Sequence, residues 1–253
     1  NGEWFELDWD QPGFEGSELQ WIGIPVAYRE EDADVIAPNA PTVWSWTDEE
    51  AKRYLSRGLY LADEAVAALV ARGYGEHVGF TAGEELPMDA VERYAEHPLN
   101  ARLAGKIRTS CASFLKGRAR ALVPQQGATV VASAEVHGRT VAPCVAGTFV
   151  NKLGGRIYAN GFFPFARMAQ MTAGLHFKRV FRWLSNETLA GEVASYHRAA
   201  MWVRGDMAAV VNMSIDEVTD MEIVLHGGKW ANGIRELGIA GAPVLKGVRE
   251  GAY

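Results

Sequence analysis

The chain has 253 residues, 48% of them hydrophobic and 22% charged, which is the balance of a globular protein with one large or two modest domains. Its formal net charge is −6 and its basic residues are scattered, which excludes a nucleic-acid partner because phosphate binding requires clustered Lys and Arg. No apolar run reaches about eighteen residues, so we expect no membrane partner and a cytoplasmic location.

The first 80 residues alternate short apolar runs with helical patterns, as βα units do. Thr47 and Glu50 have the spacing of a capping box, so we expect a helix to begin there and to end at Gly58. Asp63 is expected to cap a second helix that stops at Gly73. Short buried strands are predicted at residues 23–26, 33–37, 59–61 and 77–80. This region predicts a partial flavodoxin-like layer rather than a complete doubly wound domain.

Residues 81–117 are less regular, and we assign them as a connection with a short helix at Met88–Tyr94. From residue 118 the apolar period changes to two, and turn residues separate the runs, which predicts antiparallel strands. These runs cover residues 118–124, 128–136, 140–151, 155–163, 199–205, 207–215 and 221–227. One helix is expected over residues 171–184.

The predicted fold class is therefore α/β plus all-β, a partial α/β layer followed by an antiparallel β-sandwich that carries one helix. The predicted domain organisation is an α/β region at residues 1–80, a connection at 81–117 and a sandwich domain at 118–253.

The N-terminal part of the chain is rich in aromatic residues. The chain begins with Asn1 rather than Met, and its first 20 residues are polar and aperiodic, which indicates a processed or excised product. Exposed tryptophans can stack on sugar rings, whereas buried ones add apolar area or anchor an interface, and we favour packing or an interface. The candidate sugar-stacking residues are Trp4, Trp9, Trp21, Trp44 and Trp46.

No arrangement of residues in the sequence predicts catalysis. A glycosidase needs two carboxylates at a set distance, but the acidic run Asp48–Glu50 lies at a helix start, where it complements the helix dipole, and Glu84–Glu85 lies in a loop. The six histidines have no metal-binding spacing. We therefore predict no catalytic residue, no metal ligand and no cofactor.

Two further features have structural interpretations. Asn151–Ile157 (NKLGGRI) has paired glycines beside a basic residue, but the flanking runs are strands, so a hairpin turn is favoured over a phosphate loop. Cys111 and Cys144 have neither zinc nor redox spacing and are expected to be buried thiols.

Two parts of the sequence resemble bacterial beta-galactosidases and related glycoside hydrolases. The succession of GIPV (residues 23–26), ADVIA (residues 33–37) and residues 46–80 (WTDEEAKRYLSRGLYLADEAVAALVARGYGEHVGF) resembles the closing part of their glutamine-amidotransferase-like domain. NKLGGRI, followed by an aromatic strand, and VVNMSIDEV (residues 210–218) resemble the β-sandwich that follows it. The resemblance implies a trimerisation domain, a chemically inactive amidotransferase-like fold and two catalytic glutamates on a preceding barrel. Residues 1–80 contain no cysteine, which agrees with an inactive fold.

The leading hypothesis is a non-catalytic structural and oligomerisation region of a protein related to glycoside hydrolases. Its expected partner is a second copy of the chain or an upstream catalytic domain, and the aromatic N-terminal stretch would cover the open layer. One alternative is a carbohydrate-binding module that uses the N-terminal tryptophans. Another is a small enzyme with a site assembled from residues distant in sequence.

Overall fold

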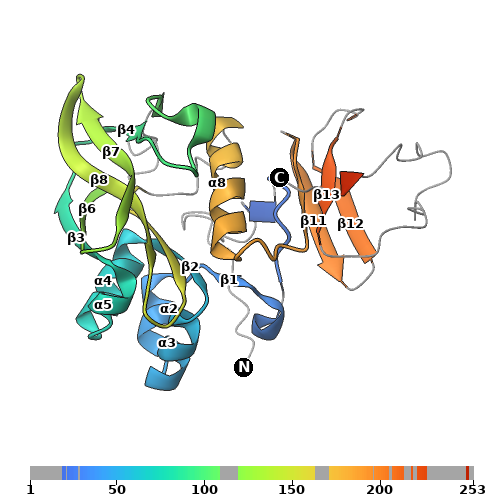
Figure 1. The fold of residues 1–253 in the computed structure, drawn as a ribbon, viewed down its shortest axis with the longest axis horizontal. Helices are drawn as coiled ribbons and strands as arrows, with labels where there is room; N and C mark the ends of the chain where they lie inside the picture. The colour runs from blue at the N-terminus through green and yellow to red at the C-terminus, as the bar shows by residue number, and fades with distance from the viewer. Residues whose placement is uncertain are drawn as a thin grey trace. The chain divides into compact units, whose positions relative to one another are not determined.

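The structure is a computed structural model that describes residues 19–20, 22–27, 29–108, 119–162, 171–195, 197–204, 207–213, 218, 221–226 and 249–250 (Figure 1). The chain divides into two compact units. The larger unit comprises residues 33–187, and the smaller unit combines residues 1–32 with residues 188–253. The boundaries expected near residues 80 and 118 both lie inside the larger unit, because strands from either side of them share one sheet.

A seven-stranded mixed sheet forms the centre of the larger unit, with the order β1-β2-β9-β8-β7-β4-β5. β1, β2 and β9 run parallel, and the remaining neighbours are antiparallel. Its strands are β1 (Val35–Ile36), β2 (Gly58–Ala62), β4 (Val91–Tyr94), β5 (Ile107–Arg108), β7 (Thr129–Val136), β8 (Arg139–Val150) and β9 (Arg156–Asn160). β3 (Phe80–Glu85) and β6 (Arg120–Pro124) form a separate antiparallel pair.

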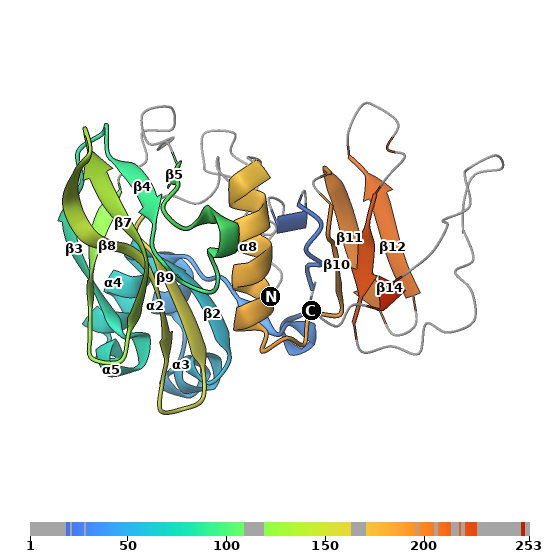
Figure 2. The same ribbon diagram turned by 45° about the horizontal axis from the view of Figure 1, so that its top comes forward.

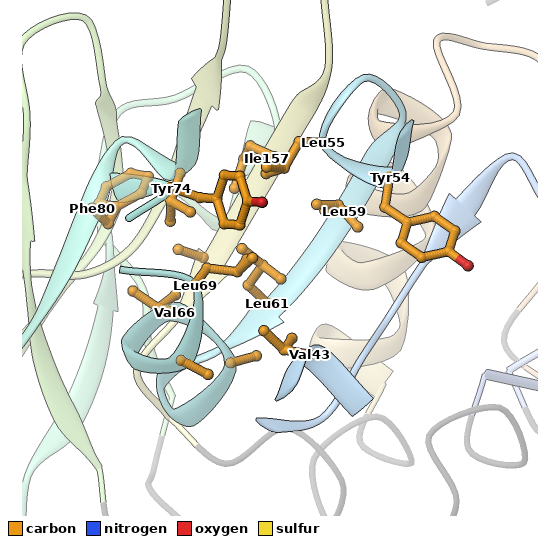
Figure 3. Packing of buried hydrophobic residues seen from close by; sticks show 14 of the residues in the cluster. Val43, Tyr54, Leu55, Leu59, Leu61, Val66, Leu69, Tyr74, Phe80 and Ile157 are labelled. Carbon is orange, nitrogen blue, oxygen red and sulfur yellow. The ribbon is translucent and has the colours of Figure 1, made fainter. Parts of the chain in front are cut away.

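Helices cover both faces of the parallel strands (Figure 2). On one face, residues of the helices pack with Leu59 and Leu61 of β2 in the main hydrophobic core. Figure 3 shows the buried side chains of this core. On the other face, Tyr60 contacts Phe177 and Phe181 of the last helix. The described helices of the unit are α2 (Ala40–Ser45), α3 (Asp48–Leu55), α4 (Asp63–Ala71), α5 (Gly75–Val78), η2 (Ala101–Leu103) and α8 (Met171–Leu184). None of the described helices is both long and apolar enough to span a membrane.

Local sequence signals explain where several elements begin and end. The capping box is present, because Thr47 Oγ1 accepts a hydrogen bond from the Glu50 amide and the Glu50 carboxylate accepts one from the Thr47 amide. The predicted helix at residues 171–184 is confirmed as α8. Gly73 follows α4 with a φ of +89°, as expected for a helix stop. Asp63 is not the N-cap of α4; Ala62 takes that position and Asp63 is the first helical residue.

The structure corrects three local predictions. Residues 88–94 do not form a helix, because residues 91–94 gain their hydrogen bonds as strand β4 between β5 and β7. Residues 75–78 form α5, and strand β3 starts only at Phe80, after Gly79 turns the chain with a φ of +77°. Residues 23–26 are not a strand; the neighbouring Ile22 makes an isolated bridge to Ala199.

The turn between β8 and β9 is the hairpin that the sequence predicts. The Asn151 side chain is buried, and its Nδ2 donates to the carbonyl oxygens of Leu55 (2.8 Å) and His77 (3.0 Å). Its Oδ1 accepts from the amides of Leu153 (2.9 Å) and Gly155 (3.0 Å). These amides therefore bind a side chain of the protein, and the turn does not present them to a phosphate.

The smaller unit contains two small sheets and the short helix η1 (Glu30–Asp32). One sheet has the order β10 (Gly191–Val193), β13 (Ile223–Leu225), β14 (Arg249–Glu250), and the other pairs β11 (Ala199–Arg204) with β12 (Met207–Asn212). Val193, Met201 and Leu225 belong to the core between these strands. The predicted combination of an α/β layer with a β-sandwich is confirmed, and the strands between residues 120 and 160 extend the α/β sheet or pair beside it.

Candidate functional site

Of the tryptophans proposed for sugar stacking, the structure describes Trp44 and Trp46. Trp44 on α2 is 58% exposed, whereas Trp46 is 8% exposed and its ring lies 4.5 Å from that of Tyr54. A ring packed in this way has no open face for a sugar. Trp4, Trp9 and Trp21 lie outside the described residues.

The acidic groups singled out by the sequence have structural partners or are exposed on a strand. Asp48 Oδ1 accepts hydrogen bonds from Tyr74 Oη at 2.7 Å and Arg72 Nη2 at 3.2 Å. The Tyr74 hydroxyl and then Arg72 hold the pKa of Asp48 below its usual range. Glu84 and Glu85 lie exposed on β3. These groups connect α3 to the end of α4 or face solvent, and they do not face each other across a site.

Metal and thiol chemistry are not supported by the part of the chain that the structure describes. Among these residues, no group of three or more His, Cys, Asp or Glu side chains is placed to hold a metal ion. Cys144 on β8 is buried, as predicted, and burial raises the pKa of its thiol to about 12. A thiol with that pKa is a poor nucleophile near neutral pH. Cys111 lies outside the described residues.

The main concentration of polar side chains lies on the sheet face that α8 covers, and we call it the polar layer. Its members come from β2, β4, β5, β9 and α8, and each is at most 4% exposed. They are Tyr60, Glu92, Tyr94, Arg108, Tyr158, Asn160 and His176. Strand alternation explains why they share a face, because Tyr60 and Tyr158 lie between residues that point into the opposite core.

A buried ion pair forms one end of the polar layer. Arg108 of β5 and Glu92 of β4 are cross-strand neighbours, and their side chains are in direct contact. Burial lowers the pKa of Arg108, but the charge of Glu92 and the neighbouring tyrosines outweigh burial and raise it. The guanidinium also lies 5.7 Å from the centre of the Tyr94 ring. Arg108 therefore stays charged and compensated inside the protein.

A tyrosine–histidine pair connects the layer to α8. Tyr158 Oη and His176 Nε2 are 3.0 Å apart, and both side chains are buried. Burial, reinforced by the charge of Arg108, lowers the pKa of His176 to about 3. Burial also holds the pKa of Tyr158 well above its usual value. Both groups are therefore neutral at physiological pH, and their hydrogen bond needs no charge.

Aromatic stacking and one amide complete the layer. The Tyr60 ring stacks on Tyr158 at 5.6 Å and on Phe181 of α8 at 5.5 Å. Asn160 Nδ2 donates to Tyr60 Oη at 2.9 Å, and its Oδ1 accepts from the Phe162 amide at 3.0 Å. These contacts fix the side-chain positions on the sheet without the help of a ligand.

The C-terminal end of α8 also packs against the strands β9 and β2. Arg156 of β9 donates from Nη1 to the Trp183 carbonyl at 2.7 Å, and its guanidinium lies 5.5 Å from the Trp183 ring centre. A Cβ on Gly58 of β2 would come within 2.4 Å of the Leu184 carbonyl oxygen. Only glycine allows so close an approach, so Gly58, the first residue of β2, has a packing role. It does not end the preceding helix as predicted, because α3 already ends at Leu55.

A second polar group lies where β2 enters α4. Asp63 has a side chain that is 14% exposed, and its Oδ2 lies 3.4 Å from Arg120 Nε of β6. Burial, and then the charge of Glu64, raises the pKa of Asp63 to about 6. The carboxyl ends of parallel strands are the usual ligand positions of α/β folds, and a strand-to-helix turn can hold a nucleophile. This turn contains Ala62, Asp63 and Glu64, and therefore neither Ser nor Cys.

Sequence reasoning missed the polar layer as a site. Glu92 and Arg108 lie in the region assigned as a connection, and Tyr158 and His176 were attributed to a strand and a core-facing helix. Burial alternates along β4, with Glu92 and Tyr94 buried. Assigning residues 91–94 as a strand would have placed these two side chains on the same face.

Comparisons with known proteins give no family for this chain. No protein-family model matches, and no curated protein matches. Among solved structures, the cytoplasmic protein STM3548 from Salmonella typhimurium is 12% identical with a TM-score of 0.44, over 66% of this chain and 78% of that one. A beta-galactosidase from Bacillus circulans sp. alkalophilus is 15% identical with a TM-score of 0.41, over 70% of this chain and 25% of that one. The structure titled mmIFT52 N-terminal domain is 13% identical with a TM-score of 0.40, over 61% and 78%. These similarities do not assign a function.

Proposed function

We propose that this chain is a non-catalytic structural and self-association region of a protein related to glycoside hydrolases. The observation that supports the non-catalytic part of this proposal is the burial of the polar layer, and the self-association part rests on the sequence resemblance. Glu92, Tyr158 and His176 are the groups best suited to acid–base chemistry, and each is at most 2% exposed. A catalytic acid or base must come within hydrogen-bond reach of its substrate, which a side chain sealed beneath α8 cannot do.

The protonation states support the same conclusion. A general acid or base works best with a pKa near the working pH, but the pKa of His176 is lowered to about 3 and that of Tyr158 is raised well above its usual value. The pKa of Asp63 is raised to about 6, but its ion-pair partner is Arg120, and the carboxylate that acts on it, Glu64, is its neighbour in the same turn rather than a group facing it across a site. The polar groups instead attach α8 to the sheet, which is an architectural role.

The proposal is tested by two measurements on the purified chain. Sedimentation velocity is expected to show self-association, and a panel of aryl glycosides is expected to show no hydrolysis above the buffer rate. A monomer that hydrolyses glycosides would overturn the proposal. Any glycosidase activity is then assigned to another part of the protein, as the sequence resemblance implies.

Carbohydrate binding is a second candidate, and the exposure of Trp44 is the observation that favours it. Trp44 on α2 is 58% exposed, and an exposed indole can stack on the apolar face of a sugar. Tryptophan fluorescence titrated with galactose and oligosaccharides measures this, with Trp44→Ala as the variant. A response at millimolar sugar that Trp44→Ala removes supports binding, and an unchanged spectrum in the wild type excludes it.

A further inference from the structure

Strands β4 and β5 are joined by residues 95–106, which we call the covering loop. The loop packs inward, since Leu99 is 7% exposed and Asn100 is fully buried. Asn100 Nδ2 donates to the carbonyl oxygens of Ala95 at 2.8 Å and Val131 at 2.7 Å, so it ties the loop to itself and to β7. The ribbon of the loop lies between those of β4 and α8 in both Figure 1 and Figure 2. The loop is therefore packed against the sheet.

The covering loop reaches the polar layer at His176. Tyr94, which directly precedes the loop, has its ring 5.1 Å from that of His176. Burial and the charge of Arg108 lower the pKa of His176, and the backbone of Leu99 partly offsets this, so Leu99 and His176 are neighbours. The charge of His97, two residues before Leu99, also acts on His176. The loop therefore closes the polar layer on the side of His176.

The covering loop contains a tight turn whose first residue is His97. The Asn100 amide donates to the His97 carbonyl oxygen at 2.9 Å, and Pro98 occupies the second position, which its fixed φ suits. The Leu99 amide donates to Nδ1 of the His97 ring at 3.2 Å. Asn and Asp are common at the first position of such turns, because their side-chain oxygen accepts that same amide. In this turn the His97 ring takes their role.

The hydrogen bond from Leu99 to His97 can form only while the ring is neutral. A backbone N–H can only donate, so Nδ1 presents its lone pair to the Leu99 amide and the ring proton is on Nε2. Nε2 lies 3.3 Å from Thr148 Oγ1 of β8, to which it then donates. A protonated ring carries a hydrogen on both nitrogens. Its Nδ1–H would point at the Leu99 N–H, so the turn would lose this bond.

We propose that the covering loop is a pH-dependent closure of the polar layer, which protonation of His97 releases. Burial lowers the pKa of His97 below its ordinary value of 6.5 in the closed loop. In the released loop the ring is solvated and regains that ordinary value. The closed form is therefore fully favoured above about pH 6.5, and this advantage is lost as the pH falls below it.

The groups around His97 leave its own protonation as the trigger. From β8 it faces Thr148, which does not titrate. From α8 the titrating group is His176, whose pKa of about 3 keeps it neutral in this range. Glu96, its neighbour in the chain, is exposed. The cations that act on His176 are Arg108 and Arg179. Arginine stays charged throughout, so within this group the charge that changes between pH 7 and pH 5 is that of His97.

Hydrogen exchange of the covering loop tests the proposal on the intact chain. Below pH 6.5 the ratio of open to closed loop can rise by up to about 10-fold per pH unit, which sets a limit of about 30-fold at pH 5. His97→Asn keeps an acceptor for the Leu99 amide and removes the titration. His137→Asn is the matched control, because the His137 side chain is 87% exposed on the turn between β7 and β8, with a φ of +48° that asparagine tolerates.

Peptides from residues 95–106 are compared among the three proteins at pH 7.5 and pH 5. In the wild type and His137→Asn, the protection of the loop relative to an unfolded chain is expected to fall several-fold, within that limit, between the two pH values. In His97→Asn it is expected to stay constant. The proposal is overturned if His97→Asn loses as much protection as the wild type, or if the wild type keeps its full protection at pH 5.

An NMR titration of the assigned His97 ring in the wild type needs no variant. The pKa of His97 is expected to lie below 6.5, because the closed loop resists the proton. A measured pKa at or above 6.5 would refute the closure even if His97→Asn failed to fold. Neither measurement depends on self-association, so the closure and the proposed function can fail separately.

Discussion

Asp63→Asn is expected to stabilise the larger unit at neutral pH. The pKa of Asp63 is raised from 3.8 to about 6 in the folded protein, chiefly by burial. The folded state therefore holds the proton more tightly than the unfolded state does, and the charged form destabilises the fold. A difference of about 2 pH units corresponds to roughly 3 kcal/mol, since each unit is worth about 1.4 kcal/mol. Asparagine keeps the shape of the side chain and carries no charge.

The sign of the pH dependence follows from the raised pKa. Below pH 3.8 Asp63 is protonated in both states and costs nothing. As the pH rises to about 6 the cost develops, and above 6 it is complete. The stability gain of Asp63→Asn over the wild type is therefore expected to be about 3 kcal/mol at pH 7 and to shrink to about 0.5 kcal/mol at pH 4.

Urea unfolding from pH 4 to pH 8 measures this difference. Hydrogen exchange of peptides from residues 58–71 isolates β2 and α4, since the two units need not unfold together. Arg120→Gln is the matched control, because it removes the charge that faces Asp63 and should destabilise the wild type only where Asp63 is ionised. The reasoning is refuted if Asp63→Asn is less stable than the wild type at pH 7, because the carboxylate would then stabilise the fold through Arg120.

Three further predictions concern the contacts of α8 and the polar layer. As the pH falls from 6 to 4, the free energy of unfolding of the wild type relative to that of His176→Gln is expected to fall by about 1.4 kcal/mol per pH unit. The reason is that the folded state resists protonation of a histidine whose pKa is lowered to about 3. If urea unfolding gives the two proteins the same pH dependence of stability, this prediction is contradicted. Glu92→Gln leaves Arg108 buried without a counter-charge and is expected to lower the free energy of unfolding in urea by about 3–5 kcal/mol. The double variant Glu92→Leu with Arg108→Met should lose less stability than either single variant. If the losses of the two single variants simply add in the double variant, the two residues are not coupled. Gly58→Ala is expected to displace α8 and lower the Tm by several degrees, with Gly105→Ala on an open turn as the comparison for backbone strain; an unchanged Tm for Gly58→Ala would show that the Leu184 carbonyl can move away.

The elements predicted correctly are those specified by nearby residues. Thr47 and Glu50 form their capping box within one helical turn, and the apolar spacing of residues 171–184 is enough to place α8. β7 and β8 follow from alternation and a short turn. In each case the deciding interactions span only a few residues or a single hairpin.

The elements missed are those that depend on distant partners. β4 (Val91–Tyr94) has the sequence VERY. It forms a strand because β7, about 40 residues later in the chain, supplies its hydrogen bonds. Glu92 and Arg108 are buried only because the sheet brings them together beneath α8, and the rule that charged residues lie outside predicts the opposite. The candidate site could not be found from the sequence for the same reason, since it joins five elements across more than 100 residues.

The central claim is that the polar layer is sealed beneath α8, and histidine labelling tests it most directly. Diethyl pyrocarbonate modifies accessible neutral histidines, and mass spectrometry of the peptides locates the modification. His137, whose side chain is 87% exposed, serves as the internal control, whereas His176 is 1% exposed. In the native protein at pH 7, His137 is expected to react while His176 is protected, and both should react in urea. Modification of native His176 at the rate of His137 would show that the layer is open, and it would contradict the non-catalytic interpretation.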